Sequence, residues 1–327
     1  MEEAAVVAEG VSKQFVIAET GRGLGGALRS LFSRRGRVIR AVQDLSFSIA
    51  QGGFVGYIGP NGAGKSTTVK MLSGILHPTS GELRVLGMSP QRQRQSVAAR
   101  IGVVFGQRTQ LWWDLPLADS YEMIAAMYGV PAATAQQRLK RFDEVLGIGE
   151  FLDVQVRKLS LGQRMRADLA GALLHGPAIL FLDEPTIGLD VMAKAAIREF
   201  LREVAGGGVT ILLTTHDMDD VERLCERIIL INHGRLVFDG TLAGLRGMVG
   251  VPTRMHLDFA SEWRGQLPDL NGSVSATSEG RRVTISFDRA VVSAAAIVAA
   301  FGDRGEITDI EISEPNIDEI VRRVYAR

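Results

Sequence analysis

The chain has 327 residues, which is enough for about two domains of roughly 100–200 residues each. Hydrophobic residues make up 46% and charged residues 23% of the sequence, a balance that is typical of folded globular proteins and excludes a disordered, collagen-like or disulfide-stapled chain. The 37 basic and 37 acidic residues cancel, so no overall positive field that would attract nucleic acid is present.

The first part of the chain has the pattern of an α/β fold. Residues 2–239 alternate short β-type runs with helical segments, which predicts a mixed, mostly parallel sheet covered by helices. Between residues 114 and 176 only helical periods occur, so a helical subdomain should interrupt the sheet there; its predicted helices are Ala118–Tyr128, Ala135–Leu146 and Leu161–Leu174. The predicted strands are Val11–Ile17, Leu45–Ile49, Phe54–Ile58, Leu83–Leu86, Ile101–Phe105, Ile179–Leu182, Thr210–Leu213, Ile228–Ile231 and Arg235–Phe238.

A basic insertion, about residues 19–40, lies after the first predicted strand. Its six arginines and one glutamate give a local charge of plus five, and Leu24, Leu28, Leu31 and Phe32 follow a helical spacing. A solvated loop and helix would explain this composition. A surface that meets anionic lipid headgroups or a membrane partner is the alternative.

A glycine-rich loop follows the predicted strand Phe54–Ile58 and precedes a helical segment. Its residues match the phosphate-binding pattern G-x-x-x-x-G-K-[ST], in which backbone amides curl around phosphate oxygens. We expect Lys65 to reach the β- and γ-phosphates and Ser66 to bind Mg²⁺. The predicted nucleotide-binding residues of this loop are Gly59, Pro60, Asn61, Gly62, Ala63, Gly64, Lys65, Ser66 and Thr67.

Two further segments carry chemistry that a phosphate loop needs. Asp183 and Glu184 follow the apolar run that starts at Ile179, so Asp183 should orient the Mg²⁺ and Glu184 should accept a proton from the attacking water. Ser160 and Gln163 form a capping-box pattern, which predicts a helix that begins at Leu161. An amide-rich helix start of this kind is able to bind a phosphate.

A second domain is predicted after residue 240. Extended patterns at Arg254–Phe259, Ser273–Thr277, Arg282–Phe287 and Ile307–Ile312 alternate with helical patterns at Glu262–Leu267, Val291–Phe301 and Ile317–Tyr325. With the weak pattern near Glu262 counted as a helix, this order resembles a ferredoxin-like β-α-β-β-α-β unit with a tail helix. We place the first domain at residues 1–240 and a small α+β accessory domain at residues 241–327.

The sequence also bears on where the chain is located. The start at Met1 is acidic where a signal peptide is basic, and the longest apolar stretch, Ala290 to Phe301, is shorter than the ~20 residues of a membrane span. The single cysteine, Cys225, has the spacing of a buried residue on an apolar helix face, shared with Val221, Leu224 and Ile228, and a buried reduced thiol fits a reducing compartment. We therefore expect the chain to stay in the cytosol.

These motifs resemble the nucleotide-binding subunits of ATP-binding cassette (ABC) transporters, over residues 6–239. The most specific part of the resemblance is Leu159-Ser-Leu-Gly-Gln163, which stands in the place of the Leu-Ser-Gly-Gly-Gln signature, with Leu161 in place of the first glycine. The resemblance implies a P-loop NTPase core of the ABC type. It also implies that Ser160, Leu161, Gly162 and Gln163 bind the nucleotide of a partner subunit.

The resemblance assigns further roles residue by residue. Gln107 is similar to the family's Q-loop glutamine, which touches Mg²⁺ or the lytic water and senses the membrane partner, although a surface glutamine would look the same. Asp190 ends a D-loop in which Ile187 and Gly188 replace the more usual Ser-Ala. His216 resembles the switch histidine that hydrogen-bonds the γ-phosphate. These assignments imply Glu184, His216 and Gln107 as catalytic residues, and Ser66, Gln107 and Asp183 as Mg²⁺ ligands.

Two aromatic features leave alternatives open. Phe15 resembles the aromatic residue that stacks on adenine, but packing in the core would also explain it. Trp112 and Trp113 adjoin the Gln107 loop, and neighbouring residues on a strand point to opposite faces, so one of them should meet a partner. In the family this region borders the groove for a helix of the membrane subunit, while packing of both side chains is the alternative.

The leading interpretation is the ATPase subunit of an ABC transporter that uses ATP and Mg²⁺ at the cytoplasmic face of the membrane. The sequence holds a single set of motifs, so two copies, or one copy and a homologue, should pair head to tail with each other around two MgATP. The dimer would drive transport through separate integral membrane permease subunits. The compact cassette and small second domain are most like the ABC-2 exporter subfamily. A soluble ABC ATPase acting on ribosomes or DNA, or a phosphotransferase, is the alternative, and neither explains the sequence as well.

Overall fold

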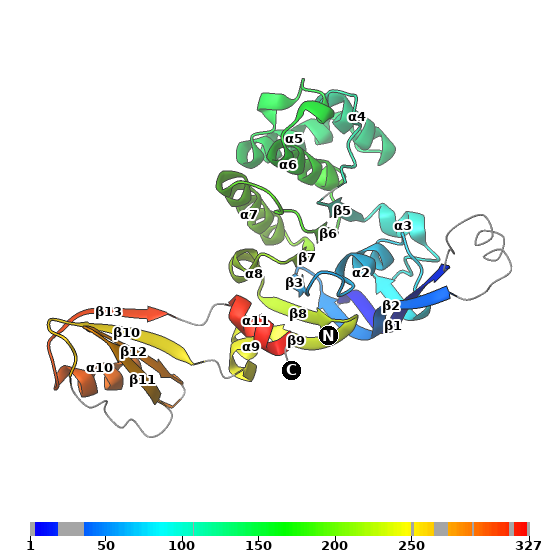
Figure 1. The fold of residues 1–327 in the computed structure, drawn as a ribbon. Helices are drawn as coiled ribbons and strands as arrows, with labels where there is room; N and C mark the ends of the chain where they lie inside the picture. Colours follow the sequence, from blue (N-terminus) through cyan, green and yellow to red (C-terminus); the bar gives the residue numbers. More distant parts are fainter. Residues whose placement is uncertain are drawn as a thin grey trace, which may run out of the picture. The chain divides into compact units, whose positions relative to one another are not determined.

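The computed structural model describes residues 4–18, 36–106, 108–249, 252–264, 274–289, 291–313 and 317–325, and Figure 1 shows their fold. The chain divides into two compact units, Met1–Thr241 and Leu242–Arg327. Each unit has its own hydrophobic cluster, as expected of separate domains.

The described part of the first unit is organised around a six-stranded sheet with the order β5-β6-β7-β3-β8-β9. The strands from β5 to β8 run parallel and β9 pairs antiparallel with β8. Their bounds are β3 Phe54–Ile58, β5 Ile101–Phe105, β6 Ile179–Asp183, β7 Thr210–Thr215, β8 Arg227–Asn232 and β9 Arg235–Thr241. All residues of β3 and β7 are buried, as expected of central strands in a parallel sheet that is covered on both faces. The predicted α/β class and mixed sheet are confirmed.

A second, antiparallel sheet of the first unit contains β1 Ala4–Ala18, β2 Gly36–Ala50 and β4 Ser80–Val85 in the order β2-β1-β4. Its apolar residues, such as Val11 and Leu45, join the same hydrophobic cluster as Tyr57 on β3. The first two strands are longer than predicted, since the hairpin that they form continues to the edge of residues 19–35, which lie outside the described part of the chain.

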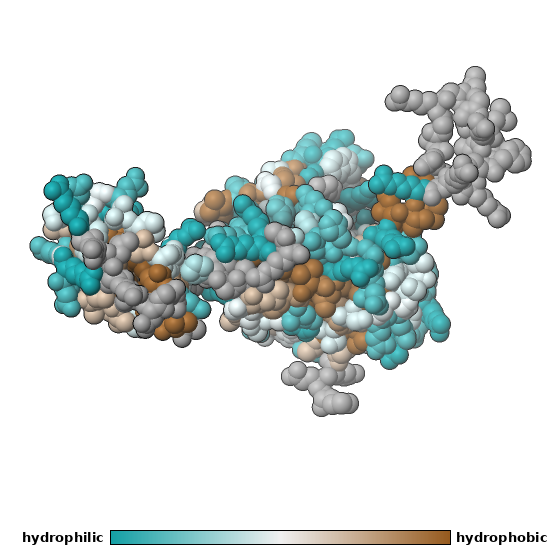
Figure 2. Space-filling view, turned by 60° about the horizontal axis from the view of Figure 1, so that its bottom comes forward, coloured by the Kyte–Doolittle hydropathy of each residue, from teal (hydrophilic) through white to brown (hydrophobic). Residues whose placement is uncertain are grey.

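The far end of the β1–β2 hairpin exposes apolar side chains. Val16 and Ile17 are 71% and 52% exposed, and their neighbours on β2, Val38 and Ile39, are 50% and 40% exposed. Hydrophobic residues gather at this end of the hairpin in Figure 2, next to the grey segment. At this end of the hairpin, apolar side chains on both faces of the ribbon are therefore exposed to solvent.

Helices fill the predicted subdomain between β5 and β6. They are α4 Leu117–Met127, α5 Ala132–Leu146 and α6 Leu161–Leu173, followed along the chain by β6 (Figure 1). The prediction that this segment is helical is confirmed. The tryptophan pair just before α4 lies in a turn and not on a strand, so the argument from strand geometry was wrong for these residues.

Among its described residues, the first unit also contains the α-helices α2 Lys65–Leu72, α3 Arg94–Ala98, α7 Val191–Gly206 and α8 Met218–Leu224. Helix α7 packs against both α5 and α8. The predicted apolar face shared by Cys225 and Ile228 is incorrect, because α8 ends at Leu224 and Ile228 belongs to β8. The thiol is nevertheless buried and reduced, at 5% exposure, and burial raises its pKa.

The second unit contains an antiparallel sheet with the order β11-β12-β10-β13. Its elements are α9 Leu242–Val249, β10 Thr253–Phe259, β11 Val274–Glu279, β12 Arg282–Phe287, α10 Ala294–Gly302, β13 Ile307–Ser313 and α11 Ile317–Tyr325. Side chains of β10, β12 and α10 form its cluster. The weak helix predicted at 262–267 is absent from residues 262–264, and the rest of it, like Ser273, lies outside the described residues. Among the residues described, no helix is both long and apolar enough to span a bilayer.

Candidate active site

The carboxyl edge of the parallel sheet brings the predicted residues together. The phosphate loop follows β3, Glu184 follows β6 and His216 follows β7, and these strands are neighbours in the sheet. Ligands of α/β proteins bind at this edge because the loops that leave it converge there.

The phosphate loop has a backbone that favours glycine. Gly62 and Gly64 have φ angles of +82° and +105°, in the left-handed region. A Cβ on Gly64 would lie 2.4 Å from the carbonyl oxygen of Ala41, whereas a Cβ on Gly62 would meet nothing within 4 Å. In the described structure α2 begins without a side-chain cap or an acidic residue in its first turn. Its free amide groups and the positive end of its dipole therefore suit a phosphate.

Lys65 lies at the base of this loop with only 6% of its surface exposed. Its Nζ donates hydrogen bonds to the carbonyl oxygens of Gly59 at 2.7 Å and Pro60 at 3.3 Å, and it lies 3.7 Å from Glu184 Oε1. Burial lowers the pKa of Lys65, while the charges of Glu184 and Asp183 oppose this shift. The buried ammonium group of Lys65, at the base of the phosphate loop, is well suited to bind an anionic ligand.

Glu184 is held between the phosphate loop and His216. Its second carboxylate oxygen, Oε2, lies 3.6 Å from Nδ1 of His216. Its φ angle of +55° is unusual for a residue with a side chain. Asp183, just before it, accepts a hydrogen bond from Thr214 Oγ1 at 2.6 Å, so the preceding carboxylate is anchored to the next strand. The structure thus groups Lys65, Asp183, Glu184 and His216.

Gln107 lies outside the described residues, but the residue before it, Gly106, packs closely against Asp183 and Glu184. The amide of Gly106 donates to the carbonyl oxygen of Asp183 at 2.8 Å. A Cβ on Gly106 would lie 2.3 Å from the carbonyl oxygen of Glu184. The chain that enters Gln107 is therefore packed directly against the backbone of Asp183 and Glu184.

The predicted capping box at the start of α6 is confirmed. Ser160 Oγ accepts from the amide of Gln163 at 3.2 Å, and the amide of Ser160 donates to Gln163 Oε1 at 2.9 Å. Two of the three residues that depart from the family pattern lie close together here: a Cβ on Gly188, whose φ is +71°, would lie 3.2 Å from Cδ2 of Leu161. Asp190 caps α7 by accepting from the amide of Ala193 at 2.8 Å.

Phe15 lies on β1, opposite Ile39 of β2, and is half-buried. Lys13 places its Nζ 5.2 Å from the centre of the Phe15 ring. The ring therefore remains partly accessible and next to a cation. Its stacking on adenine stays a prediction.

Asp168 is a buried residue that sequence reasoning missed. It lies on α6 with 4% exposure and accepts hydrogen bonds from Thr109 Oγ1 at 2.8 Å and the amide of Gln110 at 3.1 Å. It ties the helix that starts at Ser160 to the segment that directly follows Gln107. Burial raises its pKa to about 6, against the opposing effect of these hydrogen bonds. An acidic residue at helical spacing from the apolar Met165 and Ala172 was the sequence signal.

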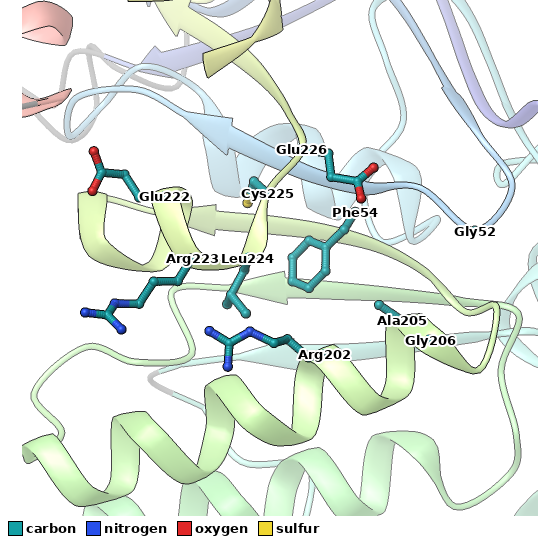
Figure 3. Close-up of a pocket in the computed structure, with 10 residues that line it drawn as sticks. All are labelled: Gly52, Phe54, Arg202, Ala205, Gly206, Glu222, Arg223, Leu224, Cys225 and Glu226. Carbon is teal, nitrogen blue, oxygen red and sulfur yellow. The ribbon is translucent and has the colours of Figure 1, made fainter. Parts of the chain in front are cut away.

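A cavity of about 460 Å³ lies away from these residues, at the amino ends of β3 and β8 (Figure 3). Phe54, Arg202, Leu224 and Cys225 are among the residues that line it. The predicted site residues do not contribute to it, so it is separate from the phosphate loop at the other end of β3.

Comparisons with known proteins agree with this arrangement. A family model described as ABC transporter matches residues 42–187. The ABC transporter ATP-binding protein NatA of Bacillus subtilis (strain 168) is 33% identical over 65% of this chain and 87% of that protein. The daunorubicin resistance ATP-binding protein DrrA3 of Streptomyces coeruleorubidus is 33% identical over 86% of this chain and 90% of that protein.

The Nod factor export ATP-binding protein I of Ralstonia nicotianae (strain ATCC BAA-1114 / GMI1000) is 39% identical over 61% of this chain and 62% of that protein. A solved dimeric structure of the ATP-binding cassette MJ0796, in a post-hydrolysis state with ADP and Pi, is 26% identical, with a TM-score of 0.60 over 72% of this chain and 98% of that one. The chain belongs to the family of ABC transporter ATP-binding proteins, and it is an ATPase of that family.

Gly106→Ala should lower ATP turnover, because the new methyl group would displace the backbone of Glu184. We expect a loss of about tenfold or more in kcat, the scale that small displacements of a reacting group produce. Steady-state phosphate release from the purified chain measures it. Gly206→Ala is the matched control, since a Cβ there meets nothing within 4 Å. Equal activity of the two variants would contradict the packing argument.

Asp168→Asn should change how stability depends on pH. The folded-state pKa of Asp168, about 6, lies above its ordinary value of 3.8, so the folded protein binds more protons than the unfolded chain between these values. Wild-type stability then falls as the pH rises through this window, and the Asn variant lacks that loss. Urea unfolding should show the variant gaining about 1–3 kcal/mol relative to wild type between about pH 4 and pH 7.

Asp258→Asn is the control for that measurement. The hydrogen bond from Arg282 lowers the pKa of Asp258, so this carboxylate stabilises the fold above its unfolded pKa and loses that effect only at lower pH. Its variant should not gain on wild type across the same window. A gain of equal size in both variants would contradict the assignment to Asp168.

Proposed function

We propose that this chain is the ATP-hydrolysing subunit of an exporter, which works as a head-to-tail dimer on separate membrane subunits. The placement of Glu184 carries the proposal: one oxygen faces Lys65 of the phosphate loop and the other faces His216. A carboxylate between the phosphate cradle and a histidine is where a general base for water attack on a γ-phosphate belongs.

The residues of the chain divide the work of hydrolysis. The amides of residues 59–67 and the ammonium of Lys65 hold the phosphates. Ser66 and Asp183 offer the hydroxyl and carboxylate oxygens that Mg²⁺ prefers, and Gln107 would complete the set. When bound, Mg²⁺ would neutralise negative charge on the phosphates. Glu184 takes a proton from water, and His216 donates a hydrogen bond to the oxygen on which charge develops.

A second copy, or a homologue, would complete each site. The chain carries one phosphate loop and one Ser160–Gln163 segment, and Ser160 and Leu161 are exposed at the start of α6. Exposed first-turn amides with a satisfied capping box suit a phosphate presented by another subunit. The dimeric MJ0796 cassette, which has the same fold, supports this arrangement.

Export through membrane subunits is supported by the relatives named for daunorubicin resistance and for Nod factor export. Trp113 offers a docking residue: it is 49% exposed, follows Gln107 closely in the sequence, and has Arg164 5.3 Å from its ring. Trp112 is half-buried. We place the subunit peripherally at the cytoplasmic face of the membrane, with residues 1–240 as the ATPase domain and 241–327 as the accessory domain. Nucleic acid is not expected as a partner.

Glu184→Gln should keep ATP affinity and nearly abolish turnover. The amide preserves the shape of the side chain but cannot accept the proton, so kcat should fall by ~10²–10⁴. The variant should accumulate as a nucleotide-bound dimer, which size-exclusion chromatography with ATP detects. Retained turnover in Glu184→Gln would contradict the assignment of the base.

Lys65→Ala should instead weaken ATP binding itself, because it removes a positive charge from the cradle.

Trp113→Ala should release the subunit from membranes that contain its permease. Truncation of an interface tryptophan costs about 2 kcal/mol or more, which is roughly a thirtyfold loss of affinity. Copurification with the membrane fraction, measured against the wild type, tests it. Ile75→Ala is the control, because Ile75 is similarly exposed, at 47%, but is distant in the sequence from Gln107. Wild-type recovery of a folded Trp113→Ala variant would show that this side chain does not dock.

A further inference from the structure

A cluster of charged side chains lies between α7 and α8. Lys194 and Arg198 are one turn apart on α7, and Asp217 and Asp220 lie at the start of α8. Lys194 Nζ is 2.5 Å from Asp217 Oδ2, and Arg198 bridges both acids, with Nε 2.5 Å from Asp220 Oδ1 and one terminal nitrogen 3.7 Å from Asp217 Oδ1. The two positive and two negative charges balance.

Asp220 is the buried centre of this cluster, with no exposed surface. Its second oxygen, Oδ2, accepts a hydrogen bond from Thr186 Oγ1 at 2.5 Å, and Thr186 is itself 2% exposed. A carboxylate away from water is tolerated only when its charge is paired and its oxygens are hydrogen-bonded. Arg198 and Thr186 meet both needs.

The cluster is connected to both loops that carry the reacting groups. Thr186 follows Glu184 by two residues, before the D-loop. Asp217 follows His216 directly and caps α8 by accepting from the amide of Asp219 at 3.1 Å. The left-handed backbone of Glu184, with φ of +55°, is a conformation that persists only when its surroundings fix it.

We propose that Thr186, Asp220 and Arg198 are positioning residues that set the carboxylate of Glu184 against the imidazole of His216. Thr186 anchors the segment after Glu184 to α8, and Arg198 anchors α8 to α7 through Asp220 and Asp217. The two loops thereby share one rigid support, formed by α7 and α8. The described hydrogen bonds and ion pairs of Asp220 and Arg198 reach neither Glu184 nor His216, so their action is through the backbone.

Thr186→Val is the sharpest test, because valine keeps the branched shape and deletes only the hydroxyl donor. In the full-length chain we expect kcat for ATP to fall about tenfold while KM stays within about twofold, since the nucleotide cradle is untouched. Thr186→Ser restores the donor and should recover most of the lost turnover. A role limited to fold stability would lower the unfolding midpoint of Thr186→Val and leave kcat of the folded fraction unchanged.

Arg198→Lys provides a second, independent test. Lysine keeps the charge but lacks the fork that bridges Asp220 and Asp217, so kcat should again fall about tenfold at unchanged KM. Arg227→Lys is the matched control: two nitrogens of Arg227 each donate to Asp239 at 2.7 Å, on β8 and β9 away from the site. Its kcat should equal that of the wild type.

Three results would overturn the proposal. These are wild-type kcat in both Thr186→Val and Arg198→Lys, a Ser variant as slow as the Val variant, or a rise in KM without a fall in kcat. If Thr186→Val does not fold, the comparison of Arg198→Lys with Arg227→Lys decides. The inference rests on ATP hydrolysis by the chain, and a failure of the proposed base would appear separately as retained turnover in Glu184→Gln.

Discussion

The register of the parallel strands is the constraint on which the site depends. Strands β6, β7 and β3 are neighbours whose pairing aligns Asp183 with Thr214, and Ile58 with Thr215. Because side chains alternate between the two covered faces of the sheet, a shift of one residue would exchange every side chain between those faces and disrupt the packing on both. The hydrophobic core therefore fixes where each strand ends relative to its neighbours at the carboxyl edge. These relative positions set the distances among Lys65, Glu184 and His216.

The same constraint explains why much of the site could be predicted from the sequence. Short apolar runs identify buried strands, and a chemical motif that directly follows such a run must lie at the carboxyl edge. The capping box at Ser160 and Gln163 is local and could be predicted for the same reason. The α/β class, the helical subdomain and the family were all recovered from these local patterns.

Features that depend on tertiary contacts were not predicted. The end of α8 at Leu224 is set by the entry into β8, so helical spacing wrongly extended the face of Cys225 to Ile228. The exposed turn at Trp113 has no periodic signal. Asp220 looks like a surface residue in an acidic stretch, Asp217 to Asp220, yet it is fully buried, because Arg198 and Thr186 from a distant segment surround it. Sequence patterns record neither partner.

Leu161 in the signature segment and Gly188 in the D-loop both depart from the family pattern, and one close approach between them explains both. Leu161 stands where the family has glycine, and its Cδ2 would lie 3.2 Å from a Cβ at Gly188. A larger residue at one position is therefore accommodated by the smallest residue at the other. Gly188 also adopts a φ of +71°, which a side chain would disfavour. The start of α6 and the D-loop are thus shaped as one surface.

Helix α6 connects that surface to the segment after Gln107. Ser160 caps the helix, and Asp168 lies eight positions later, about 12 Å along its axis. Asp168 binds Thr109 and Gln110, so the helix cannot shift along its axis without pulling on this segment or breaking buried hydrogen bonds. Loss of those bonds would leave a buried carboxylate without donors, which is costly. Asp168 therefore holds residues 109–110 and the helix that Ser160 caps together as one packed unit.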